Sequence, residues 1–210
     1  MTAAHRVFVY LLLCSAVAGG CHPASAKATA RQAGHQLPKV TDADVKFMQG
    51  MIGHHTQAIA MVDLLKTHSQ RNDMKLLGQR IEVSQADEIR MMKTWLANHG
   101  QAAPTDADYT MMMAMPDMAM PGMLTQKQMD ELAAARAADF DRLFLEYMIQ
   151  HHQGALTMVR ELMATPGAGQ DSGIYAFASE VEADQSAEIN RMRALRATMG
   201  KNPDAGSGHR

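Results

Sequence analysis

The sequence has almost no cysteine. Of its 210 residues only Cys14 and Cys21 are cysteines, and both lie within the first 26. The rest of the chain therefore has no disulfide and no thiolate metal ligand. Any soft-metal chemistry there must use the thioether of methionine and the imidazole of histidine. These ligands suit an oxidising compartment, because thioethers resist oxidation better than thiolates do.

Basic runs, strand patterns and catalytic motifs are also missing. Lys and Arg number 20 against 22 Asp and Glu, with no basic stripe, so nucleic acid is not an expected partner. Aromatic residues are only 5% of the chain, and no alternation of apolar and polar residues predicts a strand. Because no nucleophile, base and acid set is visible, we expect no hydrolytic activity and no enzyme.

The first 26 residues are predicted to be a signal peptide. Arg6 precedes an apolar run over residues 7–18, which is too short to span a bilayer and is typical of a secretory leader. Cleavage at Ala24-Ser25-Ala26 would release a soluble periplasmic protein. Residues 18–21 loosely resemble a lipobox, which would make Cys21 a lipidated first residue. The soluble form is favoured, and membrane contact is expected only if Cys21 is lipidated.

The main positive feature is a duplicated segment. Residues 47–62 and 144–159 are identical at eight of sixteen positions, including Met-x-x-His-His and a later Met. At about 100° per residue, the shared positions of the first copy fall within an arc of about 120°. The positions that differ, among them Gly50, Gly53 and Gln57, fall on the opposite side. We therefore expect the shared face, with its two histidines, to point inward.

Helix signals surround both copies. A capping box at Thr41 and Asp44 opens a helix that ends near His68, and a second helix is capped by Asn72 or Asp73 and ends near Gly100. Residues 125–164 are helical after a second capping box, as one helix or two, and a last helix covers residues 171–199. The fold class expected is all-α: a ferritin-like four-helix bundle over residues 41–200, built from two duplicated hairpins, 41–100 and 125–200. A flexible arm (27–40), a Met-rich loop (101–124) and a disordered tail (201–210) complete the chain.

The duplicated face carries candidate metal ligands. A Met followed by His three and four residues later puts a sulfur and an imidazole side by side on a helix. Facing helices would complete the site with Met92, Met192, Glu88 or Glu188. A ligand set of imidazole and thioether favours copper, Cu(I) in particular. Met61 lies two turns from His54, which indicates a separate site or the core. The alternative is that the histidines are structural and bond Glu or Gln on the next helix. The candidate ligands are Met51, His54, His55, Met61, Met92, Met148, His151, His152, Met158 and Met192.

Methionine is abundant, at 20 residues, and concentrated in the linker. Residues 111–123 contain seven of them among prolines, too many for a loop to bury as core. A flexible run of thioethers can wrap a soft monovalent ion such as Cu(I) or Ag(I). The alternative is an adaptable apolar contact with a partner. The candidate ligands are Met111, Met112, Met113, Met115, Met118, Met120 and Met123.

The doubled motif resembles the domain of unknown function 305 family. The resemblance rests on residues 51–58 with Met61 and on residues 140–155 with Met158, together with the matched positions 85, 88, 89, 92 and 185, 188, 189, 192. It covers roughly residues 42–199. The resemblance implies an exported, ferritin-like four-helix protein that binds copper in the periplasm through Met and His.

The function expected is therefore a periplasmic copper-binding protein that buffers or delivers Cu(I), with Cu(II) or Ag(I) as further ions. Its expected partners are the metal ion and other periplasmic copper-handling proteins, and self-association is left open. Three alternatives were weighed. The first is a di-iron enzyme, but the sequence has no Glu-x-x-His motif. The second is a haem protein; the sequence has no Cys-x-x-Cys-His motif for covalent attachment, although non-covalent Met/His ligation stays open. The third is a metal-free interaction module, in which the histidines would serve only stability.

Overall fold

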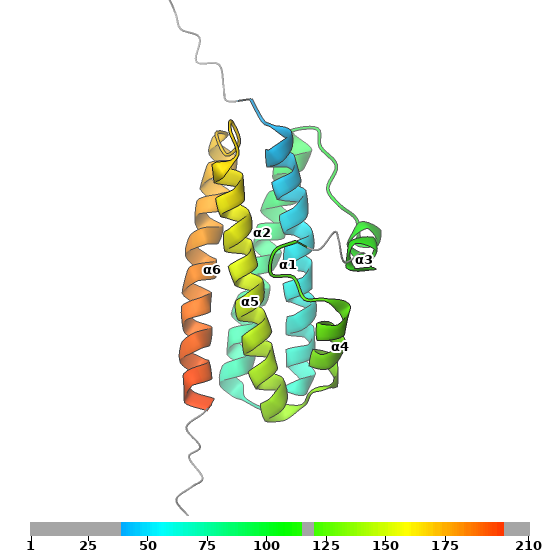
Figure 1. Cartoon of the computed structure of the whole chain (residues 1–210), viewed down its shortest axis with the longest axis vertical. Helices are drawn as coiled ribbons and strands as arrows, with labels where there is room; N and C mark the ends of the chain where they lie inside the picture. The colour runs from blue at the N-terminus through cyan, green and yellow to red at the C-terminus, as the bar shows by residue number, and fades with distance from the viewer. Residues whose placement is uncertain (1–38, 115–119, 200–210) are drawn as a thin grey trace, which may run out of the picture. The chain divides into compact units, whose positions relative to one another are not determined.

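The computed structural model describes residues 39–114 and 120–199, and within them the chain is all-α. Four long helices form two hairpins, α1 with α2 and α5 with α6, which meet where α1 packs on α5 (Figure 1). Short α4 contacts both α1 and α5. The all-α prediction is confirmed. The helices are α1 (Asp42–His68), α2 (Asn72–Asn98), α3 (Asp106–Ala114), α4 (Gln126–Ala134), α5 (Ala137–Ala164) and α6 (Ser172–Met199).

Several predicted segments lie outside the described residues. They are the signal peptide (1–26), most of the arm (27–40) and the tail (201–210). Among the helices that are described, none combines the length and apolar character needed to cross a membrane.

The capping residues explain which helix boundaries were predictable. Thr41 and Thr125 each form the expected capping box at the start of α1 and α4. The predicted cap of α2 is wrong: the N-cap is Arg71, whose guanidinium pairs with the Asp73 carboxylate at 2.6 Å. Residues 125–164 divide into α4 and α5, with Ala137 at a positive φ of 50°.

The linker is not entirely a loop, because α3 occupies residues 106–114. Thr105 Oγ1 accepts the Asp108 N–H at 3.3 Å, and Asp108 Oδ2 accepts the Thr105 N–H at 2.7 Å. This is the same capping arrangement that opens α1. The prolines of the linker concealed it, so the prediction of a continuous loop over 101–124 was wrong for this part.

Asp44 links the start of α1 to the α5–α6 connection, which predicts a stability difference. Its Oδ2 accepts the Thr41 N–H at 2.8 Å, and its Oδ1 accepts the buried Gly169 N–H at 2.7 Å. Thr41→Ala removes only a helix cap and should lower the free energy of unfolding by about 1 kcal/mol. Asp44→Ala should cost about 2–3 kcal/mol, because it also leaves the Gly169 N–H unpaired. Urea denaturation of both variants checks this order, and equal losses would contradict it.

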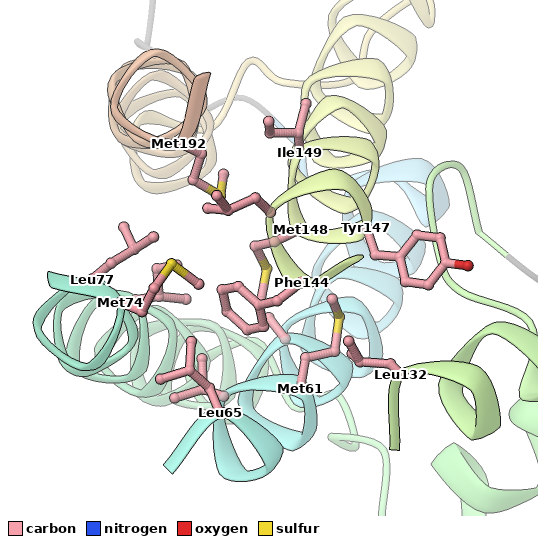
Figure 2. Packing of buried hydrophobic residues seen from close by; sticks show 14 of the residues in the cluster. Met61, Leu65, Met74, Leu77, Leu132, Phe144, Tyr147, Met148, Ile149 and Met192 are labelled. Carbon is pink, nitrogen blue, oxygen red and sulfur yellow. The ribbon is translucent and has the colours of Figure 1, made fainter. Parts of the chain in front are cut away.

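The core is divided into two apolar clusters. The first core packs around Phe144 and Leu65, with side chains from α1, α2, α4, α5 and α6 (Figure 2). The second core packs around Trp95 and Phe177. On each long helix the residues of the two cores occupy different stretches, for example 58–65 and 47–52 on α1. The buried side chains between these stretches are polar.

Candidate metal centre

A buried layer of polar side chains separates the two cores. Each long helix contributes two members, all at most 6% exposed. We call this set the polar layer: His54 and His55 on α1, Gln85 and Glu88 on α2, His151 and His152 on α5, and Gln185 and Glu188 on α6. The prediction that the doublets face inward is confirmed. Burying so many polar groups is costly unless they bond one another or a ligand.

The first histidine of each doublet bonds a backbone carbonyl. His54 Nε2 lies 3.1 Å from the Pro121 oxygen, and His151 Nε2 lies 2.9 Å from the His54 oxygen. A carbonyl can only accept, so in both rings Nε2 carries the proton and Nδ1 has the free lone pair. The two rings lie 3.8 Å apart between centroids. Neither Nδ1 has a hydrogen-bond partner among the described residues.

The second histidine of each doublet bonds a carboxyl group instead. His55 Nε2 is 2.5 Å from Glu88 Oε2, and His152 Nε2 is 2.6 Å from Glu188 Oε2. These are the histidine–glutamate contacts that the structural alternative expected. Glu82, which also lies on α2, bonds neither histidine, since it pairs with Lys66 at the surface. The two histidines of a doublet therefore differ in what Nε2 bonds, a carbonyl or a carboxyl group, whereas the Nδ1 atoms of all four lack a hydrogen-bond partner among the described residues.

Burial keeps the imidazoles of His54, His55 and His151 neutral. It lowers the pKa of both His54 and His55 to about 3, with neighbouring histidines adding to the effect, and it lowers the pKa of His151 well below its usual range. Burial, together with the nearby Asp184 and Glu188 carboxylates, raises the pKa of Glu88 to about 8. At neutral pH the layer therefore offers uncharged nitrogen lone pairs, the form in which histidine binds metals.

The six helical methionines predicted as metal ligands lie on both sides of the polar layer. Three belong to the first core and three to the second, and all six are at most 8% exposed. Because α1 and α5 traverse the two cores in opposite order, Met51 and Met148 lie on opposite sides although each precedes its doublet by three residues. Figure 2 shows the first-core set beside Phe144. The first-core set is Met61, Met148 and Met192, and the second-core set is Met51, Met92 and Met158.

The linker methionines whose side chains the structure describes are not gathered in one place. Met111 is 57% exposed on α3, whereas Met123 is buried at 7%. Met112 and Met120 are half-buried and lie against Gly50 and Gly53 of α1. Met115 and Met118 lie outside the described residues, as does the side chain of Met113. The run of thioethers was predicted to wrap one ion. In the part of the linker that the structure describes, these thioethers instead lie in separate places.

Sequence reasoning missed the segment 120–124, which is clamped onto α1 and α5. Gln57 binds Leu124 twice, accepting its N–H at 2.7 Å and donating to its carbonyl at 3.0 Å, and Gln150 donates to the Gly122 carbonyl at 3.3 Å. Gln57 is fully buried, so its predicted place on the outer side was wrong. One signal of this contact was available in the sequence. At the position that Gln57 occupies in the first copy of the duplicated segment, the second copy has Gly154.

Within residues 39–114 and 120–199, no three His, Cys, Asp or Glu side chains are grouped so that they could hold a metal ion. The di-iron alternative therefore has no ligand set in this part of the chain. A site in the polar layer must instead use few nitrogen ligands or combine them with thioethers.

Known structures resemble this fold over most of the chain. A candidate secreted DUF305 protein from Streptomyces coelicolor is 25% identical, with a TM-score of 0.64, covering 75% of this chain and 94% of its own. A DUF305 fragment from Deinococcus radiodurans is 28% identical, with a TM-score of 0.60 and coverage of 79% and 100%. CopM in its Cu(I)-bound form is 28% identical, with a TM-score of 0.57 and coverage of 74% and 96%, and it is also known in Cu(II)-bound and Ag-bound forms.

No curated protein matches the chain. The model of the domain of unknown function DUF305 matches residues 44–196, which include nearly all of the four long helices and the whole polar layer. The resemblance carried by the two Met-x-x-His-His segments is thereby confirmed, and the chain belongs to the DUF305 family.

Proposed function

We propose that this protein binds copper, chiefly as Cu(I), in the polar layer, and that His54 and His151 are the principal ligands. The observation that carries the proposal is the pair of neutral imidazoles, 3.8 Å apart, whose buried Nδ1 atoms have no hydrogen-bond partner among the described residues. Their Nε2 protons are held by carbonyl oxygens, and such a bond fixes the tautomer and ring orientation of a metal-binding histidine.

The surroundings favour a soft monovalent ion over a hard one. The nitrogen ligands are uncharged, the flanking methionines supply soft sulfur, and no carboxylate other than the two bonded to His55 and His152 is buried in the layer. A monovalent ion also brings less charge into a low-dielectric interior than a divalent one. Ag(I) shares these preferences, and Cu(II) is the weaker candidate.

The relatives support a metal-binding role. CopM binds Cu(I), Cu(II) and Ag in its solved forms and has the same fold at 28% identity. With the predicted signal peptide, this supports an exported, periplasmic protein that buffers copper or delivers it to other copper-handling proteins, without catalysis. The lipid-anchored form through Cys21 is the alternative location.

Anaerobic Cu(I) titration against a competing chelator tests the proposal on the protein lacking residues 1–26. The double variant His54→Gln with His151→Gln keeps an amide donor for each carbonyl but removes both Nδ1 lone pairs. We expect it to bind the Cu(I) ion of the polar layer at least about 100-fold more weakly, because the ligands of that site are lost.

The matched control is His68→Gln, a half-buried histidine outside the layer whose Nε2 also contacts a carbonyl, that of Ala133, at 3.0 Å. It should keep wild-type affinity. Unchanged Cu(I) affinity in the double variant, with retained helicity by circular dichroism, would show that the layer is structural. Deleting the Met-rich segment is a poorer test, because Met123 and Leu124 are buried.

A further inference from the structure

Two thioethers of the linker lie against α1 at a place distinct from the polar layer. Met112 and Met120 cover Gly50 and Gly53, which are about one turn apart. A Cβ on Gly53 would lie 3.5 Å from Met112 Sδ and 3.4 Å from Met120 Cε. A Cβ on Gly50 would lie 2.9 Å from Met120 Sδ, closer than such contacts occur. The space occupied by the Met120 sulfur therefore depends on the absence of a side chain at Gly50, whereas Met112 and Met120 lie at contact distance from Gly53.

A third thioether reaches the same place from α5. Met158 Cε would lie 3.5 Å from a Cβ on Gly50, and Met158 is 8% exposed at the edge of the second core. Met120 packs against that core as well. Met120 thus lies against both glycines, with Met112 from α3 at Gly53 and Met158 from α5 at Gly50.

The cluster is reachable from solvent. Met112 and Met120 line a cavity of about 270 Å³ between α1 and the start of the linker, together with Gly50, Gly53 and Tyr109. An ion in the cavity could contact the linker thioethers without passing through the packed core.

Only the first copy of the duplicated segment has the glycine pair. The corresponding residues of α5 are Tyr147 and Gln150. A glycine inside a helix costs about 1 kcal/mol relative to alanine, so two of them destabilise α1. Helix packing does not require them, because α5 has the same role without them. In this structure the absence of a side chain at Gly50 makes room for the Met120 sulfur.

We propose that Met112, Met120 and Met158 form a second, all-thioether site for a soft monovalent cation. Neutral sulfur ligands favour Cu(I) or Ag(I) over Zn²⁺ and harder ions. The site adjoins the polar layer, since Pro121, the residue after Met120, accepts the hydrogen bond from His54. This inference rests on the proposed function, from which the identity of the bound ion is taken. The role assigned to this site is to capture the ion at the surface.

Titration with Ag(I), which stays monovalent in air, tests the site on the protein lacking residues 1–26. Met112→Leu with Met120→Leu removes two sulfurs at nearly constant volume. We expect this variant to lose one tightly bound Ag(I) per chain and to keep the ion of the polar layer. The control, Met111→Leu with Met163→Leu, removes two exposed thioethers, one of them also from α3, and should lose none.

Met158→Leu should lose the same ion as the linker variant, and excess Zn²⁺ should not displace that ion from the wild type. A linker variant that keeps every tightly bound Ag(I) would overturn the proposal, as would displacement by Zn²⁺. His54→Gln with His151→Gln separates the two claims. If that variant loses no ion while the linker variant loses one, the proposed function of the polar layer fails and the thioether site stands.

Discussion

Gly154→Ala is expected to lower the free energy of unfolding by about 3 kcal/mol or more, the range of severe overpacking. A Cβ on Gly154 would lie 1.9 Å from the Pro121 oxygen and 2.6 Å from Gly122 Cα. These are backbone atoms and cannot rotate aside, so the segment 120–124 would have to leave α5. That movement would also break the hydrogen bond between His54 and Pro121.

Gly53→Ala is the matched control for this prediction. Gly53 is also a buried helical glycine, but its Cβ would meet the flexible end of Met112, at 3.1 Å from Cε. Alanine is the better helix former by about 1 kcal/mol, so this variant should be neutral or slightly stabilised. Guanidinium denaturation of both proteins gives the comparison. A Gly154→Ala protein within about 1 kcal/mol of wild type would contradict the close backbone contact.

The second large effect expected is a stability maximum close to pH 6.5 in the metal-free protein. The pKa of His54 and of His55 falls from 6.5 to about 3 on folding, so the folded state binds fewer protons there and loses stability as the pH drops from 6.5 towards 3. The pKa of Glu88 rises from 4.5 to about 8, so the folded state retains a proton that the unfolded chain releases. Stability should therefore also decline as the pH rises towards 8.

Between pH 4.5 and 6.5 the two effects oppose each other, and the histidines prevail because there are more of them. Each unit of pKa shift corresponds to about 1.4 kcal/mol, so the acid side should lose several kcal/mol and the alkaline side less. Chemical denaturation from pH 4 to 9 measures the profile. Glu88→Gln should abolish the alkaline decline, whereas Glu82→Gln, at the surface, should not. A flat profile between pH 6.5 and 8 would contradict the buried, protonated Glu88.

The fold was predictable where local signals decide it. Thr41 and Thr125 cap their helices through residues three positions away, so sequence alone located α1 and α4. The α2 start was mispredicted because an ion pair between Arg71 and Asp73 replaced the expected side-chain cap. The helix α3 was missed because the same capping pattern stood among prolines.

The candidate site was predictable only in part. The repeat and its helical periodicity placed His54, His55, His151 and His152 on inward faces, and all four are buried. Gln57 was misplaced, because periodicity within one helix gives no information on a distant segment that covers its outer side. The grouping of Met112 and Met120 over α1 depends on the same long-range docking.

The sequence by itself determined the helices, their duplication, the inward histidine doublets and the restriction to imidazole and thioether ligands. These properties follow from spacing and composition, which act over a few residues. Only the tertiary structure decided which histidine of each doublet bonds a carbonyl oxygen through Nε2 and which bonds a carboxyl group, because that depends on contacts with Pro121, Glu88 and Glu188 from other segments. It also decided which methionines meet, since hydrogen bonds from Gln57 and close backbone contact with Gly154 hold the end of the linker in place.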